Sequence, residues 1–198
     1  MIHRRLVGPA LAAALILAAC GGDPPPPPQP VGPTAEELEQ MRQDSIRAAE
    51  EAARLAREAA EAAQREQAAA EAAMREARAT LEEMVFFDYD ESTLRADAEA
   101  VLRSKAGILR ASPAVRIRIE GHADERGSTE YNIALGNARA EAVRQFFVSF
   151  GIDAGRFDMV SYGEERPLAM GSNESSWARN RRAEFVLTAG ADQINPGM

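Results

Sequence analysis

The sequence predicts an α+β domain, an α/β sandwich, over residues 84–188, preceded by a long helix over residues 34–83. At Met84 the composition changes abruptly from alanine, glutamate and arginine to aromatic residues and alternating patterns. Strand and helix patterns then follow one another in the order β-α-β-α-β, with a further short helix and strand at the end. The helix patterns turn apolar residues to one side, which need a sheet to pack against. We therefore expect a sheet that helices cover on one side.

Residues 1–19 have the pattern of an export signal, with a charged head at residues 3–5 and an apolar core too short to span a bilayer comfortably. The segment ends in LAAC at residues 17–20, which resembles the lipobox of bacterial lipoproteins. That resemblance implies that Cys20 is lipidated and becomes the first mature residue. An ordinary signal peptide, or a small membrane anchor with an incidental cysteine, is the alternative. Gly21 and Gly22 follow Cys20, with no aspartate at the position next to the cysteine, which resembles the pattern for sorting to the outer membrane.

Residues 20–33 are rich in proline, with an unbroken run at residues 24–28. Proline lacks the amide donor and fixes its own backbone torsion, so this run cannot enter a helix interior or a sheet ladder. The composition predicts an extended polyproline spacer that rises about 3.1 Å per residue. A docking ligand for an aromatic groove is the alternative, but beside a lipid anchor we favour the spacer.

Residues 34–83 contain no glycine or proline and are dominated by helix-forming residues. Thr34 and Glu37 have the spacing of a capping box at the start of a helix. Large apolar residues are too sparse for a sustained heptad seam, which favours a solvated single helix over a coiled coil. At about 1.5 Å per residue, it would reach about 75 Å. A self-associating rod is the second hypothesis, and it predicts concentration-dependent oligomers.

The domain should contain four strands and three helices. Strands are expected at residues 84–87, 115–120, 157–162 and 183–188, and helices at residues 94–109, 129–150 and 173–180. The second strand alternates apolar and charged residues, which places Glu120 on a polar outer face. Asn173 can cap the last helix. Residues 189–198 lack any pattern, and we expect a disordered, frayed tail there.

One stretch, residues 121–143, places an acid and a base where both can face a small ligand. Asp124 lies in a glycine-bounded loop between a strand and a helix, and Arg139 lies within that helix. A carboxylate and a guanidinium at fixed separation select a ligand that carries both charges, a zwitterion. The alternatives are a turn or capping role for Asp124 and a solvated helix charge for Arg139.

Several motifs in order resemble one family. They are MVFFDYDES at residue 84, GHADERG at 121, YN at 131, LG at 135, RA at 139, SYG at 161 and NRRAEFVL at 180. Together they resemble the OmpA-like peptidoglycan-binding domain, most closely its Pal branch, the peptidoglycan-associated lipoproteins. The resemblance covers residues 84–188.

The resemblance implies that Asp124 and Arg139 grip diaminopimelate, the zwitterionic end of a peptidoglycan stem peptide. By the same likeness, the Asp88, Tyr89 and Asp90 turn forms another wall of the pocket. Asn132 either lines the site or fastens the loop to the helix. The implied protein lies in the outer membrane and faces the periplasm. It needs no cofactor, and during cell division a TolB-like periplasmic protein competes with peptidoglycan for its domain.

Three basic residues near the last strand, Arg179, Arg181 and Arg182, form a cluster. Salt bridges to the acidic surface are the default expectation for them, and a contact with the wall or a partner is the alternative.

Other classes of function fit the sequence less well. The net charge of −8 disfavours nucleic acid as a partner. The single cysteine, Cys20, allows neither an intramolecular disulfide nor a cysteine metal cage. His122 with Asp124 and Glu125 suggests a metal-dependent hydrolase, but catalytic zinc usually takes two or three histidine or cysteine ligands. No serine or cysteine nucleophile motif is present in the mature sequence. We therefore predict a binding protein, not an enzyme, with no metal.

Overall fold

The computed structural model describes residues 32–197. The predicted signal segment, Cys20 and most of the proline-rich spacer lie outside these residues. The chain falls into two compact units, which divide between Arg54 and Leu55. Within the described part of the chain, the structure contains no helix with both the length and the apolar character that crossing a membrane requires.

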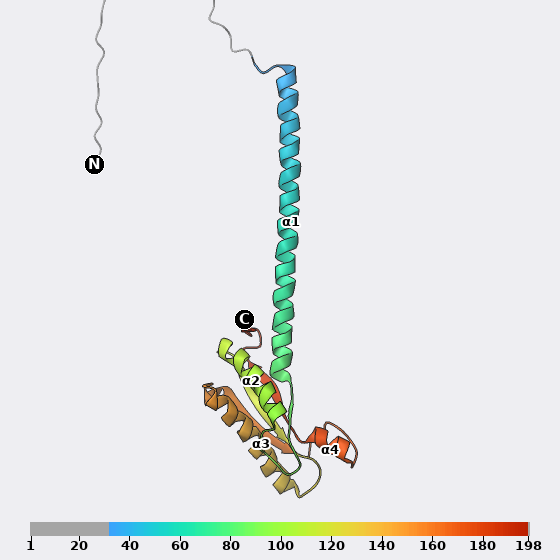
Figure 1. Ribbon diagram of the computed structural model, residues 1–198, viewed down its shortest axis with the longest axis vertical. Coiled ribbons are helices and arrows are strands. Elements are labelled where there is room, and N and C mark those ends of the chain that lie inside the picture. The colour runs from blue at the N-terminus through green and yellow to red at the C-terminus, as the bar shows by residue number, and fades with distance from the viewer. Residues whose placement is uncertain (1–31, 198) are drawn as a thin grey trace, which may run out of the picture. The chain divides into compact units, whose positions relative to one another are not determined.

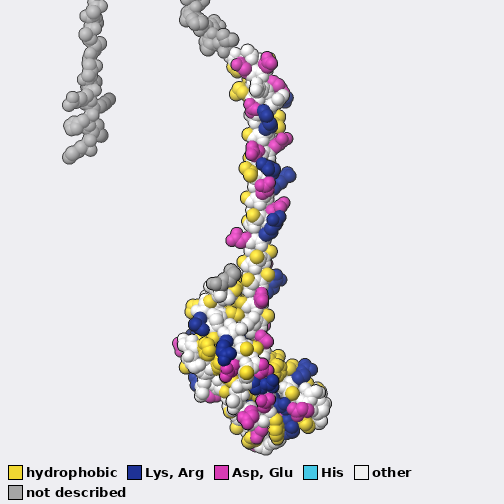
Figure 2. Space-filling model, viewed as in Figure 1, with side chains coloured by type: hydrophobic (Ala, Val, Ile, Leu, Met, Phe, Trp, Pro, Cys, Tyr) yellow, Lys and Arg dark blue, Asp and Glu magenta, His cyan; other side chains and the backbone are white. Residues whose placement is uncertain are grey.

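The first helix, α1, runs over Ala35–Glu82 and confirms the predicted long helix. Its start has the expected capping box: the Glu37 amide donates to Thr34 Oγ1 at 3.3 Å, and the Thr34 amide donates to Glu37 Oε2 at 2.7 Å. Acidic and basic side chains are interspersed along its surface (Figure 2). Near its end, Ala77 and Leu81 are buried in the core of the second unit. The last turns of α1 are therefore part of the folded domain.

The sheet has four strands in the order β1-β4-β2-β3. Their bounds are Val85–Phe86 for β1, Arg116–His122 for β2, Phe157–Gly163 for β3 and Arg182–Ala189 for β4. The central strand β2 pairs parallel with β3 and antiparallel with β4, and β1 pairs antiparallel with β4. Because β2 lies between two neighbours, the site loop that starts at its end is held by strands on both sides.

Two helices, α2 (Ala96–Ala111) and α3 (Thr129–Ser149), lie side by side and pack on this sheet (Figure 1). The short helices η1 (Ala154–Arg156) and α4 (Glu174–Asn180) complete the fold, and Asn173 caps α4 as predicted. Side chains from both layers form one core, which includes Leu102, Leu109, Ile117, Ile119, Val143, Phe147 and Phe185. The predicted α+β sandwich is thus confirmed.

The backbones of α3 and β2 approach closely at two glycines. A Cβ added to Gly121 would lie 1.9 Å from the carbonyl oxygen of Gly136. A Cβ added to Gly136 would lie 2.2 Å from Ser161 Oγ. The absence of side chains at these two positions lets α3 pack directly on the end of β2, where the site loop begins.

Two expectations differ from the structure. Glu120 lies on the face opposite the core but is only 5% exposed, because the segment after β3 covers that face: the Arg166 carbonyl accepts a hydrogen bond from Arg182 there. The last residues do not form a frayed tail. Ile194 is 4% exposed within the core cluster, and the Asn195 amide donates to Ser112 Oγ at 2.8 Å.

Lys105 in α2 ties the end of α1 to the domain. Its side chain is fully buried, and Nζ donates to the carbonyl oxygens of Leu81 at 2.8 Å and Glu83 at 2.5 Å. The last carbonyls of a helix lack intrahelical partners, so this cation satisfies groups that would otherwise stay unpaired. Burial lowers the pKa of Lys105 from 10.5 to about 7, and the nearby charge of Glu83 opposes that shift.

This lysine makes stability depend on pH. Between pH 7 and 10.5 the unfolded chain holds a proton on Lys105 that the folded chain has released, so the free energy of unfolding rises with pH. We expect a contribution of about 2 kcal/mol between pH 7 and pH 9. Urea unfolding of the wild type and of Lys105→Met at both pH values measures it. Parallel changes in the two proteins would contradict this assignment.

Candidate functional site

The site loop runs from the end of β2 to the start of α3. The Ala123 amide donates to the Gly163 carbonyl at 2.8 Å, which ties the loop to the end of β3. Ser128 caps α3 by accepting from the Tyr131 amide at 3.3 Å. Gly127 has a φ of 110°, a conformation that favours glycine. The loop is therefore short and fixed at both ends, with Asp124 between them.

Asp124 is 4% exposed and already paired with two arginines. Arg126 donates to both carboxylate oxygens, at 3.0 and 2.7 Å, and its amide donates at 3.1 Å. Arg181 donates to Oδ2 at 3.3 Å. Burial alone would raise the pKa of Asp124, but the hydrogen bonds from Arg126 and Arg181 outweigh it and lower the pKa. Asp124 is thus held as a carboxylate.

Arg126 is a lining residue of the site that was not predicted from the sequence. Its guanidinium carbon lies 4.0 Å from the Tyr89 ring centroid and 4.2 Å from that of Trp177. The Trp177 indole in turn donates to Glu125 Oε1 at 3.0 Å. Arg126 is in the GHADERG motif, but the two rings that contact it come from distant segments. The motif could indicate the charge, whereas only the fold shows the aromatic contacts.

Arg139 is fully buried, and its guanidinium binds backbone carbonyls. It donates to Glu91 O at 2.8 Å, His122 O at 2.7 Å and Asp88 O at 3.1 Å. Burial lowers the pKa of Arg139 to about 10. This arginine therefore fastens the turn at residues 88–91 to the end of β2.

A cavity of about 160 Å³ opens beside the loop. It is lined by Tyr89, Asp90, Asp124, Arg126, Gly127, Tyr131, Asn132 and Leu135. Four of the predicted site residues, Tyr89, Asp90, Asp124 and Asn132, therefore meet at one place. Arg139 and Asp88 are not among the lining residues: Arg139 supports the wall from behind, and the Asp88 side chain lies 3.4 Å from Arg95.

The cavity wall offers both kinds of hydrogen-bonding group. Asn132 is 1% exposed, and its Nδ2 atom has no hydrogen-bond partner among residues 32–197. The Tyr131 hydroxyl donates to Asp90 Oδ1 at 2.5 Å, which raises the pKa of Tyr131. Asp90 has a φ of 59°, a left-handed conformation that aspartate tolerates better than most residues. The arrangement suits a small ligand with both acidic and basic groups.

The basic cluster is divided between two environments. Arg181 and Arg182 are buried and bind acidic partners, with Arg181 2.7 Å from Glu174 and Arg182 2.5 Å from Glu184. Arg179 is exposed. The expected salt bridges are thus confirmed for two of the three arginines, although those two do not lie on the surface.

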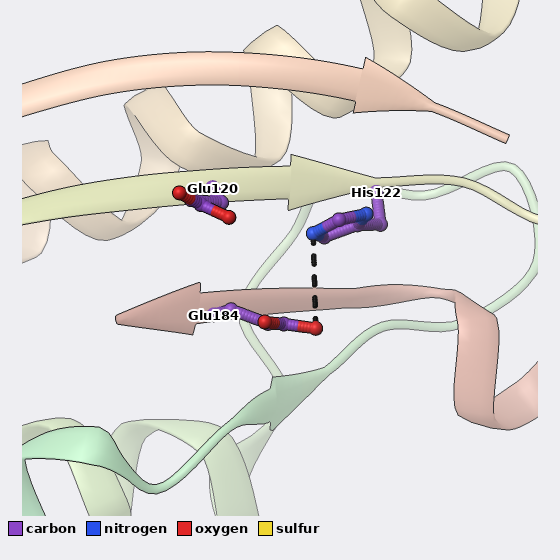
Figure 3. Close-up of side chains that lie close together, drawn as sticks. All are labelled: Glu120, His122 and Glu184. Atoms are coloured by element: carbon purple, nitrogen blue, oxygen red, sulfur yellow. Dashed lines mark ion pairs between the residues drawn. The ribbon is translucent and has the colours of Figure 1, made fainter. Parts of the chain in front are cut away.

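His122, Asp124 and Glu125, the metal ligands that the sequence suggests, do not form a common site. Asp124 binds Arg126, and Glu125 binds Trp177. Within the described part of the chain, His122 instead lies near Glu120 and Glu184 (Figure 3). Burial and the neighbouring charge of Arg182 lower the pKa of His122 to about 4.

The sequence of this domain is similar to that of known proteins. The sequence model of the OmpA family matches residues 86–181. Over 105 residues the chain is 49% identical to the peptidoglycan-associated lipoprotein of Brucella melitensis, a match that covers 53% of this chain and 62% of that protein. With its counterpart in Pseudomonas aeruginosa it shares 48% identity over 100 residues, covering 50% of this chain and 59% of the relative. The match thus spans about three fifths of the length of these curated relatives.

A solved structure is also similar. The crystal structure of the peptidoglycan-associated lipoprotein from Burkholderia pseudomallei has 43% sequence identity and a TM-score of 0.52. The match covers 53% of this chain and 89% of that one.

Proposed function

The chain belongs to the peptidoglycan-associated lipoproteins, and from this premise we propose that it holds the outer membrane to peptidoglycan without a covalent bond. The observation that carries the proposal is the polar cavity beside Asp124, which lies within the part of the chain that the family matches. Lipid on Cys20, in the inner leaflet of the outer membrane, would supply the other attachment. The domain then faces the periplasm.

The ligand proposed for the cavity is diaminopimelate of the stem peptide. Asp124 and Asp90 offer carboxylate oxygens to its ammonium group, and Asn132, which has an unpaired amide donor, lines the same cavity. Arg126 brings a positive charge to the same wall. Arg139 acts indirectly, because it holds the turn at residues 88–91 that carries Tyr89 and Asp90.

Many weak contacts can make a firm attachment. Lipid anchoring would keep the domains at high effective concentration beside a polymer that repeats the same stem peptide. Single contacts can then exchange while the membrane stays attached. This fits a proposed role with a TolB-like periplasmic partner, which would compete for the domain as the envelope constricts during division.

Replacing Asp124 by asparagine is expected to weaken wall binding at least about tenfold. The substitution keeps the shape but removes the charge, and a hydrogen bond to a charged group contributes about 1.5 to 3 kcal/mol. The measurement is co-sedimentation of the purified full chain, in mild detergent, with sacculi that contain diaminopimelate. Asp158→Asn, at an exposed position on β3, is the matched control and should bind like the wild type.

Two results would count against the proposal. If the wild type stayed in the supernatant, the chain would not be a wall anchor. If the wild type and Asp124→Asn sedimented equally, the chain would bind the wall through another surface. Circular dichroism of each variant confirms that it is folded.

A further inference from the structure

His122 is a buried histidine whose ring is not used by the cavity. The side chain is 1% exposed, and neither Nδ1 nor Nε2 has a hydrogen-bond partner among the described residues. Buried polar groups nearly always have a partner, so an orphan imidazole calls for an explanation. Its Nε2 atom faces the carboxylate of Glu184 on the neighbouring strand β4 and lies 3.8 Å from Oε1 (Figure 3). That distance is too long for a hydrogen bond.

Two carboxylates lie beside this ring, on neighbouring strands. Glu120 of β2 and Glu184 of β4 are direct cross-strand partners, which places like charges opposite each other. One ligand atom from each of Glu120, His122 and Glu184 lies within 4.8 Å of the other two. Glu120 is 5% exposed, so this is a largely enclosed group of acceptors and not a surface cluster.

We propose that Glu120, His122 and Glu184 form a Zn²⁺ site that joins β2 to β4 on the sheet face opposite the core. Imidazole nitrogen and carboxylate oxygen are both common zinc ligands, at about 2.0 to 2.2 Å, and imidazole disfavours Mg²⁺ and Ca²⁺. Around one tetrahedral ion the ligand atoms lie about 3.4 Å apart, so the three side chains must close by about 1 Å. A water molecule would fill the fourth position. The Glu184 side chain is 26% exposed, which leaves a route of entry.

Two arginines hold the carboxylates in the metal-free protein. Arg118 donates to Glu120 Oε1 at 2.8 Å, and Arg182 donates to Glu184 Oε1 at 2.7 Å. Arg182 holds Glu184 Oε1 through both Nε and Nη2, and this is the oxygen nearest His122, so zinc must displace Arg182 or bind Oε2. The arginines balance the like charges of the strand pair when no metal is bound, and they compete with the metal when it is present. We therefore expect moderate affinity that rises when an arginine is removed.

The position of His122 would link this site to the cavity. Its carbonyl oxygen accepts from Arg139, and Asp124 follows two residues later. A metal bound to the ring would fix the end of β2, from which both the site loop and the support of the turn at residues 88–91 start. The proposed role is a clamp and not catalysis.

Metal titration of the full chain tests this directly. Wild-type and His122→Gln proteins are purified in detergent, stripped with a chelator and titrated with ZnCl₂ against a chromophoric competitor. The wild type should bind one more Zn²⁺ per chain than His122→Gln, and zinc should raise its melting temperature by several degrees while leaving the variant unchanged. MgCl₂ should have no effect on either. Contributions from Cys20 or His3 are the same in both proteins and cancel in the difference.

Further variants keep the result clear. Glu184→Gln changes a partly exposed side chain and should weaken zinc binding by more than about tenfold, even if His122→Gln folds poorly. Arg118→Gln removes the contact with Glu120 and should therefore tighten zinc binding. The Arg118 side chain is 42% exposed, so its replacement should disturb the fold little. Equal zinc stoichiometry and affinity in the wild type and in Glu184→Gln would overturn the proposal, as would a wild type that zinc does not stabilise.

Discussion

Replacing Arg139 by methionine is expected to lower the free energy of unfolding by about 3 to 5 kcal/mol. Methionine fills most of the volume but leaves three carbonyls without their donor: that of His122, which is buried, and those of Asp88 and Glu91, whose contacts are partly buried. Each buried group left unpaired costs about 1 to 3 kcal/mol, offset in part because a desolvated charge is also removed. Urea unfolding followed by circular dichroism measures the change.

The same helix offers a control. Arg144 on α3 is 28% exposed and pairs with Glu141 one turn away, so Arg144→Met should cost less than about 1 kcal/mol. The stability loss of Arg139→Lys should lie between those of Arg144→Met and Arg139→Met, because an ammonium cannot reach three divergent carbonyls as a guanidinium does. An Arg139→Met protein as stable as Arg144→Met would show that the turn at residues 88–91 does not depend on this side chain. Where Arg139→Met still folds, sacculus binding should fall with the loosened cavity wall.

Replacing Gly121 by alanine should lower the free energy of unfolding by about 3 kcal/mol. The added methyl group would lie 1.9 Å from the carbonyl oxygen of Gly136 and 2.6 Å from its carbonyl carbon. Both are backbone atoms, so no side chain can rotate away and α3 must move off β2. Since α3 carries Asn132 and Arg139, the cavity should be disturbed with it. Thermal unfolding of the variant and the wild type measures the loss.

Gly107→Ala is the opposite case. Gly107 lies within α2, and a Cβ there meets no atom within 4 Å. Alanine is the better helix former, so this substitution should stabilise the domain by about 0.5 to 1 kcal/mol. If both alanine variants behaved alike, the close approach of α3 and β2 would not be the reason for glycine at position 121.

The elements that local patterns determine were predictable. The long helix α1 follows from composition and a capping box, which involve residues at most four apart. The strands β2 and β4 follow from alternation, and α3 was placed within one residue of its observed end. For Asn132 the sequence left two roles open, lining the site or fastening the loop to the helix, and in the structure it lines the cavity with Asp124.

What the sequence could not show depends on distant contacts. The sequence predicted that Arg139 faces a ligand together with Asp124, with a solvated helix charge as the alternative, whereas its guanidinium binds the carbonyls of residues 88, 91 and 122. Ile194 is one apolar residue without a period, so its burial against the domain left no pattern to detect. The ring of His122 meets Glu184 only because β2 and β4 pair, and the sequence alone suggested Asp124 and Glu125 instead.

The short segment from Leu81 to Glu91 has a further consequence. It is fastened in close succession by Lys105 at Leu81 and Glu83, by β4 at Val85 and Phe86, and by Arg139 at Asp88 and Glu91. If the chain joins a membrane to a wall as proposed, tension on α1 passes through its buried last turns into this segment and reaches the cavity after a few residues. Leu81, Val85 and Phe87 of this segment belong to the hydrophobic core, so the core also holds it in place. The helices α2 and α3 supply Lys105 and Arg139, and the hydrogen bonds of these two side chains keep the segment from detaching under tension.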